Sequence, residues 1–168
     1  MITRALWTTS WLFFFTFNSW GQTTKDASLQ LRALRLEPFI VESARRYGID
    51  PALLRSVCFV ESGFRVEAIS PKGARGPMQF MTETATRYGL RNPHDPKAAI
   101  DAAAHYLRDL LMKFGGRVDL ALAAYNSGEG TVQSFLTGRR LVLPCGKVLI
   151  RVVCSPVVSH PILRRVNT

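Results

Sequence analysis

The chain has 168 residues and a formal net charge of +10, from 22 Lys and Arg against 12 Asp and Glu. An apolar fraction of 47% is ordinary for a globular chain and argues against intrinsic disorder. No apolar run reaches the roughly 18 residues that a membrane-spanning helix needs, and the length suits one domain behind a targeting segment.

The first 21 residues are predicted to be a secretory signal peptide. Residues 1–4 form a short basic start, residues 5–17 form an apolar core, and small residues precede a cut after Gly21. No Cys follows the apolar core closely, which argues against a lipoprotein anchor. We therefore expect an exported protein, periplasmic or associated with the cell wall, with no integral membrane segment after cleavage. Export also disfavours nucleic acid as the partner of the basic charge.

Residues 37–137 are predicted to form a mainly α domain, after a linker or helix at 22–36. Pro38 suits the first turn of a helix, and Gly48 suits its end after two arginines. Strand patterns are absent before residue 140, so the domain is expected to be built from helices and loops.

Two further helices begin with the same signature, an aspartate that can cap the helix followed by a proline in its first turn. Asp50-Pro51 predicts a helix to about Ser62, and Asp95-Pro96 predicts the longest helix, to about Phe114. Shorter helices are predicted at 82–88, 119–125 and 131–137.

Residues 138–168 form a basic end whose sequence pattern differs from that of the helical domain. A small β-hairpin is predicted at 141–150, where two apolar triplets flank a segment with Pro and Gly. From residue 130 onward the chain has six basic residues and no carboxylate. Most of the excess positive charge therefore belongs to this end.

The three cysteines and three histidines do not have the spacing of a metal site, and neither a metal nor another cofactor is expected. Cys58 lies within an apolar helical pattern and is predicted to be a small buried hydrophobe. Cys145 and Cys154 are close enough in sequence to form a disulfide, but spacing alone leaves their pairing open.

Glu61 is the carboxylate whose position in the predicted helix suits a catalytic proton donor. Leu54, Val57 and Glu61 fall at i, i+3 and i+7 of one predicted helix, which puts the carboxyl group on the core-facing side of the last turn. Apolar surroundings and the negative end of the helix dipole both disfavour the carboxylate, so its pKa is expected to be raised. A proton donor near neutral pH requires such a pKa. On this pattern alone the alternative, a solvated Glu at a fraying helix end, stays open.

Two later segments accompany Glu61 in a recognisable order. The loop that begins with ESGF at 61–64 continues to GARGPMQF at 73–80, and residues 123–130 read AAYNSGEG. Together these segments resemble the SLT-type lytic transglycosylases, a branch of the lysozyme-like superfamily that cleaves bacterial peptidoglycan. The resemblance extends from about Pro38 to about Ile150 and implies a lysozyme-like fold.

The resemblance assigns roles residue by residue. Glu61 matches the single catalytic acid and base, Ser62 matches the residue that shapes the end of its helix, and Ser70 matches a polar residue near the N-acetyl group of the substrate. Pro77 stands where the family usually has leucine. The matches to motifs that line the glycan-binding cleft are Gly76, Met78, Gln79, Tyr125 and Asn126. For Met78 and Tyr125 a role in core packing stays open.

The resemblance implies a lytic transglycosylase that cleaves the β-1,4 bond between N-acetylmuramic acid and N-acetylglucosamine. It implies a 1,6-anhydromuramoyl product and no second carboxylate. Two alternatives use the same scaffold: a non-catalytic glycan-binding protein of envelope assembly, and a hydrolase similar to goose-type lysozyme. A nucleic-acid-binding protein is disfavoured because the chain has no recognition motif for nucleic acid. The expected partner is peptidoglycan glycan strands, and a place in a secretion or conjugation apparatus stays open.

The end of the chain departs from the family pattern. Many members continue into a last helix with a pattern like E-T-x-x-Y-V, whose tyrosine reaches the cleft. Residues 151–168 contain neither Tyr nor Glu. One wall of the cleft is therefore expected to differ from that of other members.

Overall fold

The computed structural model describes the backbone of residues 12–139 and the side chains from Asp26 onward. The hairpin predicted at 141–150 and the pair Cys145 and Cys154 lie outside the described residues. The start of the predicted signal peptide also lies outside them, and cleavage after Gly21 stays a prediction.

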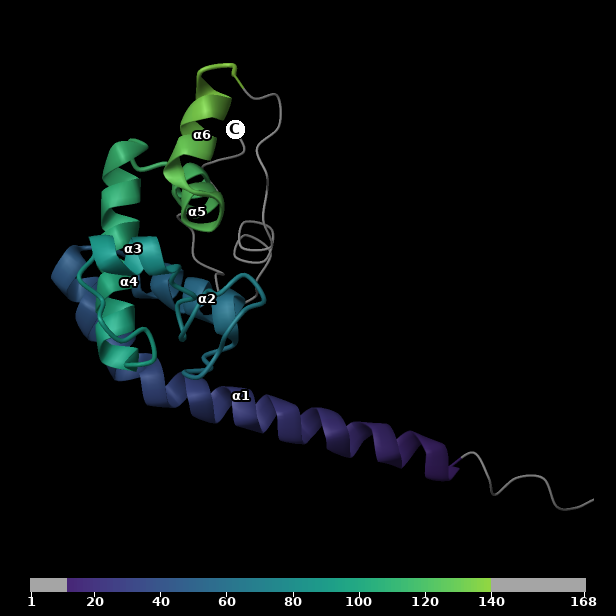
Figure 1. Cartoon of the computed structure of the whole chain (residues 1–168). Helices are drawn as coiled ribbons and strands as arrows, with labels where there is room; N and C mark the ends of the chain where they lie inside the picture. Colours follow the sequence, from purple (N-terminus) through teal and green to yellow (C-terminus); the bar gives the residue numbers. More distant parts are fainter. Residues whose placement is uncertain (1–11, 140–168) are drawn as a thin grey trace, which may run out of the picture.

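Six α-helices make up most of the described part of the chain (Figure 1). Within this part there is no strand, and two isolated antiparallel bridges fold the loop between the second and third helices back on itself. The mainly α prediction is therefore confirmed, and the five helices predicted after Gly48 are found within two residues of the expected bounds. In chain order the helices are α1 (Leu12–Tyr47), α2 (Pro51–Ser62), α3 (Thr82–Arg87), α4 (Pro96–Lys113), α5 (Val118–Ser127) and α6 (Glu129–Leu136).

The first helix differs from the prediction. The helix expected to open at Pro38 begins at Leu12, and Pro38 lies inside it. Proline in a helix interior removes one hydrogen bond and crowds the carbonyl group four residues earlier. Leu36 and Ile40, on either side of Pro38, are buried in the core at 3% and 0% exposure. The helix continues through the proline because this tertiary packing outweighs the local penalty.

The ends of α2 are fixed by the residues that the sequence singles out. The side chain of Asp50 accepts a hydrogen bond from the backbone N–H of Ala52 at 2.7 Å, which satisfies a donor in the first turn. At the other end Gly63 has a φ of 60° and donates its N–H to the carbonyl of Phe59 at 2.8 Å. The register of α2, and with it the direction of Glu61, is therefore set at both ends.

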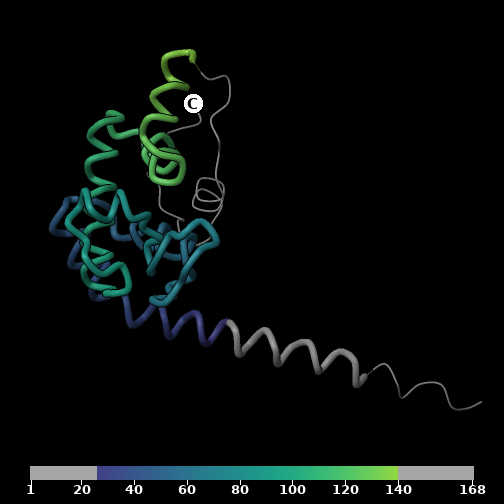
Figure 2. The backbone as a smooth tube through the Cα atoms, viewed as in Figure 1, coloured from purple at the N-terminus to yellow at the C-terminus, as the bar shows by residue number. Residues whose placement is uncertain are grey.

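The main core lies where α1, α2 and α4 meet, and a second cluster lies between α4, α5 and α6. Figure 2 shows α5 and α6 gathered at the end of the body opposite α1. Leu54, Ile100 and Leu107 are fully buried in the main core. Cys58 is also fully buried there with a free thiol, so the prediction of a small buried hydrophobe is confirmed.

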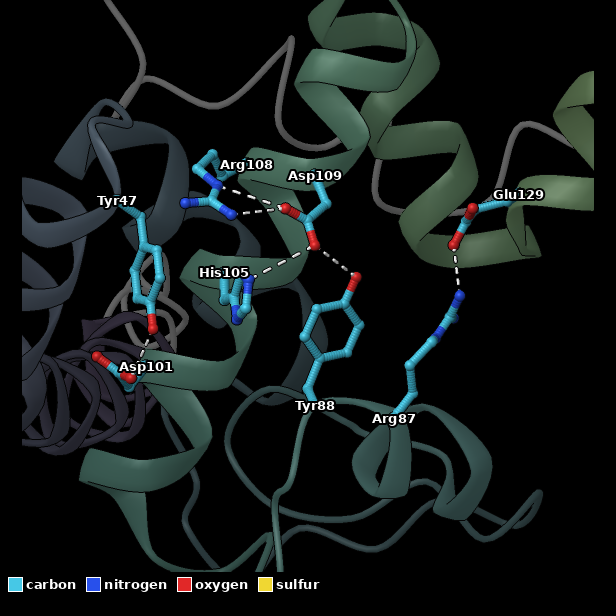
Figure 3. Close-up of polar contacts among 8 residues, drawn as sticks. All are labelled: Tyr47, Arg87, Tyr88, Asp101, His105, Arg108, Asp109 and Glu129. Atoms are coloured by element: carbon cyan, nitrogen blue, oxygen red, sulfur yellow. Dashed lines mark hydrogen bonds and ion pairs between the residues drawn. The ribbon is translucent and has the colours of Figure 1, made fainter.

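Carboxylates also tie the helices together (Figure 3). Asp101 of α4 accepts hydrogen bonds from three side chains of α1. Asp109 of α4 accepts one from the residue that follows α3. Glu129 of α6 forms ion pairs with one residue of α3 and one of α4. Their partners are Ser43, Arg46 and Tyr47 for Asp101, Tyr88 for Asp109, and Arg87 and Lys113 for Glu129.

Candidate active site

Glu61 lies in the last turn of α2. Leu54 and Val57, two turns and one turn earlier on the same side of the helix, are fully buried, so the stripe expected from the sequence is confirmed. Burial raises the pKa of the Glu61 carboxyl from its ordinary value of 4.5 to about 7. Among the residues that the structure describes, none forms a hydrogen bond or ion pair with this carboxyl group. The carboxyl group at the end of α2 is therefore partly protonated near neutral pH.

A cleft of about 930 Å³ lies in front of Glu61. Its walls come from α1, from the end of α2 and from the loop between α2 and α3. A cleft of this size is in the range of binding sites for small ligands. The predicted site residues that line it are Glu61, Ser70 and Gln79.

Gln79 is held in the cleft by a turn of its own loop. Its side-chain amide Nε2 donates to the carbonyl oxygens of Ala68 at 3.2 Å and Gly76 at 2.9 Å. These two bonds use the amide N–H groups and leave the side-chain oxygen to accept a bond from a ligand. Ser70, on the same loop, is fixed by accepting a hydrogen bond from the N–H of Ala74 at 3.0 Å.

Gly76 and Met78 shape this loop from behind. Gly76 has a φ of 78°, and a Cβ added to it would lie 1.8 Å from the carbonyl oxygen of Pro93. Only glycine fits such a close approach of two backbone segments. The side chain of Met78 is fully buried in the main core, so of its two expected roles the structure supports packing.

Tyr125 connects α5 to the loop and lies near Glu61. Its hydroxyl donates to the carbonyl oxygen of Met78 at 3.0 Å, and its ring packs edge-on against Phe80 at 6.5 Å between centroids. Burial, together with the nearby negative charge of Glu61, raises the pKa of Tyr125 well above its ordinary value. Tyr125 is therefore a neutral phenol that fixes the loop beside the carboxyl group.

Ser62 and Asn126 do not line the cleft. Ser62 is buried at 3% exposure, and its Oγ donates to the carbonyl of Cys58 at 3.3 Å and accepts from the N–H of Arg65 at 3.0 Å. Ser62 thus shapes the end of α2 from inside the protein. Asn126 is exposed in the last turns of α5, outside the lining of the cleft.

The wall of the cleft formed by α1 was not expected from the sequence. Arg32, Arg35 and Leu36 line the cleft, but a helix that begins at Pro38 could not have supplied them. The spacing of Leu29 and Leu36, seven residues apart, was a signal that this helical face extends before the proline.

Among the described residues no group of three or more His, Cys, Asp and Glu side chains could hold a metal ion. No helix within this same part of the chain has the length and apolar character needed to cross a membrane.

Residues 38–140 match the family model described as Transglycosylase SLT domain. The chain is 36% identical over 108 residues to membrane-bound lytic murein transglycosylase F 1 of Alkalilimnicola ehrlichii. This match covers 61% of this chain and 22% of that protein. The chain is also 43% identical over 96 residues to peptidoglycan transglycosylase gp16 of Escherichia phage T7. This second match covers 53% of this chain and 7% of that protein.

A solved structure of an inactive mutant of lytic transglycosylase Slt from Pseudomonas aeruginosa superposes with a TM-score of 0.55 at 30% identity. The match covers 68% of this chain and 20% of that one. The chain thus spans about a fifth of the length of this structure and of the A. ehrlichii relative. The likeness confirms the fold expected from the sequence.

Proposed function

The chain belongs to the transglycosylase SLT domain family, and on that basis we propose that it is an exported peptidoglycan lytic transglycosylase with Glu61 as general acid and base. One observation carries the proposal: the carboxyl group of Glu61 faces a cleft and has a pKa of about 7. Such a group is partly protonated at neutral pH and can both give and take a proton. The names of the relatives, which are lytic murein and peptidoglycan transglycosylases, support this substrate.

The reaction begins when Glu61 donates its proton to the oxygen that joins N-acetylmuramic acid to N-acetylglucosamine. The glycosidic bond breaks, and the electron deficiency at C1 of the muramoyl ring is relieved by its own acetamido group. Glu61, now ionised in a poorly solvated place, takes the proton of the C6 hydroxyl group. The C6 oxygen bonds to C1, which gives a 1,6-anhydromuramoyl end without consuming water.

The carboxylates around the cleft support a mechanism with a single acid. Glu61 and Glu67 are the acidic residues in the lining of the cleft. The side chain of Glu67 is 84% exposed and lies 3.4 Å from His94 Nδ1, as expected of a surface charge. Intramolecular attack by the C6 hydroxyl group needs no second carboxylate as nucleophile or base.

Gln79, Ser70 and Tyr125 would hold the substrate and the loop. Gln79 and Ser70 line the cleft, and an amide oxygen and a hydroxyl group suit the N–H and hydroxyl groups of N-acetylated sugars. Tyr125 keeps the loop in place through Met78, so it is assigned to positioning the cleft wall.

Digestion of purified peptidoglycan, followed by mass spectrometry of the released fragments, tests the proposal. We expect fragments with anhydromuramoyl ends from the wild type and none from Glu61→Gln. Glu83→Gln, an exposed carboxylate on α3, is the matched control and should release the same fragments as the wild type. Reducing ends instead of anhydro ends would identify a hydrolase similar to goose-type lysozyme, and binding without release would identify a glycan-binding protein.

A further inference from the structure

Three arginines line the same cleft as Glu61. Arg32 and Arg35 belong to α1, and Arg65 belongs to the loop that follows α2. Arg35 and Arg65 are exposed and Arg32 is partly buried. Among the described residues, none supplies a carboxylate that pairs with any of the three. The cleft therefore has a cluster of positive charge, which we call the arginine cluster.

No aspartate or glutamate in the described part of the chain forms an ion pair with the arginine cluster, although Glu61 and Glu67 line the same cleft. All 12 acidic residues lie between Asp26 and Glu129, within the residues whose side chains the structure describes. Residues 1–25 and 130–168 contain neither Asp nor Glu. The three guanidinium groups are therefore available to pair with an anionic group of a ligand.

The packing of α1 places the arginine cluster. Leu36 is buried and Leu29 packs against the main core, so this face of α1 is anchored. Leu29 also lies next to Gly63, at the point where α2 ends. Because Arg32 and Arg35 lie between these two anchors and are three residues apart, they project from neighbouring positions on the helix surface.

The arginine cluster does not serve to ionise Glu61. A guanidinium group in contact with a carboxylate would lower the pKa of the carboxyl group. The pKa of Glu61 is instead raised to about 7 by burial. None of the three guanidinium groups therefore pairs with the Glu61 carboxyl group.

We propose that Arg32, Arg35 and Arg65 form a subsite for the carboxylates of the peptide stem that N-acetylmuramic acid carries. The inference rests on the proposed function, because that function brings a muramoyl residue next to Glu61. The sugars of the glycan strand are uncharged where the lactyl group is amide-linked to peptide, so the stem supplies the anionic groups near the cleavage point. Guanidinium groups bind carboxylates with two parallel hydrogen bonds, which suits recognition of such groups. The enzyme accordingly prefers strands that bear stems over denuded strands.

The test compares two variants by binding and by turnover. The triple variant Arg32→Gln, Arg35→Gln, Arg65→Gln removes the arginine cluster. The control is Arg45→Gln, an exposed arginine on the same helix that lies outside the cleft lining. Circular dichroism and thermal unfolding establish that both variants keep the fold.

Binding is measured in the Glu61→Gln background by calorimetry, with the stem tripeptide L-Ala-γ-D-Glu-meso-diaminopimelate and with the same peptide amidated at its carboxyl groups. We expect the acidic tripeptide to bind, the amidated one to bind at least about tenfold more weakly, and the triple variant to lose binding of the acidic one by a similar factor. Binding should also weaken as NaCl is raised from 50 to 300 mM, since salt screens exposed charges. Equal binding by the triple variant and the Arg45→Gln control would overturn the inference.

Turnover is measured on intact strands and on strands stripped of stems by an amidase. We expect the triple variant to lose about tenfold in rate on intact strands at low substrate and to match the wild type on stripped strands. An equal loss on both substrates would overturn the inference. If the wild type cleaves neither substrate while the acidic tripeptide still binds through the arginine cluster, the proposed catalysis fails and the subsite stands.

Discussion

Replacing Glu61 by Gln should stabilise the folded protein at high pH, even though it removes the catalytic acid. Glutamine has nearly the shape of a protonated glutamic acid but cannot ionise. The comparison of the two proteins therefore isolates the free energy of ionising Glu61 in the folded state.

The magnitude follows from the two pKa values. The carboxyl group has a pKa of about 7 in the folded state and an ordinary value of 4.5, which applies to the unfolded chain. Between these values the folded protein holds the proton more tightly than the unfolded chain does, so the free energy of unfolding falls as pH rises. With about 1.36 kcal/mol for each pH unit, the wild type loses about 3 kcal/mol between pH 4 and pH 8.5 through this group.

The assay is urea unfolding followed by circular dichroism, at intervals from pH 4 to pH 8.5. We expect the difference in unfolding free energy between Glu61→Gln and the wild type to grow by about 3 kcal/mol in favour of the variant over this range. Glu83→Gln is the control, because this carboxylate is exposed and its substitution should change the unfolding free energy by no more than about 0.5 kcal/mol. A difference that stays constant with pH for Glu61→Gln would show that the carboxylate is solvated or paired, and would refute the burial argument.

The rate of glycan cleavage should fall above about pH 7 as Glu61 loses its proton, and a pH–rate profile with an undiminished rate at pH 9 would contradict this acid. Gly76→Ala should lower the free energy of unfolding in urea by at least about 3 kcal/mol, because the added Cβ would collide with a backbone carbonyl oxygen. Gly73→Ala is the control, because Gly73 also has a positive φ but lies in open space, and it should lower the same free energy by about 1 kcal/mol. Asp101→Ala should cost about 2–3 kcal/mol, because it leaves three donors of α1 without their acceptor, whereas Glu42→Gln at an exposed i,i+4 pair should cost about 0.3 kcal/mol. Equal losses within either pair of variants would contradict the structural reason given for it.

The parts of the fold that could be predicted from sequence are those whose cause is local. Asp95 illustrates this, because its side chain accepts from the N–H groups of Lys97 and Ala98, and all the atoms involved lie within four residues. The position of Glu61 on the core-facing side of α2 was predictable for a similar reason, because helical periodicity alone places it on the same side as Leu54.

The parts that could not be predicted depend on contacts between distant segments. Pro38 favours a helix start locally, but the burial of its neighbours against α2 and α4 keeps α1 continuous. The arginine cluster of the cleft followed from that continuity and was missed with it. Gly76 and Met78 match motifs that line the cleft in the family, with core packing left open for Met78. In the structure Gly76 is closely approached by Pro93 and Met78 is buried in the core, contacts that depend on distant segments.

The carboxylates of the chain have two opposite effects on the stability of the fold. Asp101, Asp109 and Glu129 each accept a hydrogen bond from a hydroxyl or cationic group on, or directly after, another helix, so these carboxylates stabilise the fold as acceptors (Figure 3). Glu61 has no such partner among the described residues, and its ionised form destabilises the fold. A cationic partner would hold the Glu61 carboxyl ionised near neutral pH and remove its ability to donate a proton. The absence of a partner is thus a requirement of the proposed chemistry, and substitutions at Glu61 and Asp101 should change stability in opposite directions at pH 8.5.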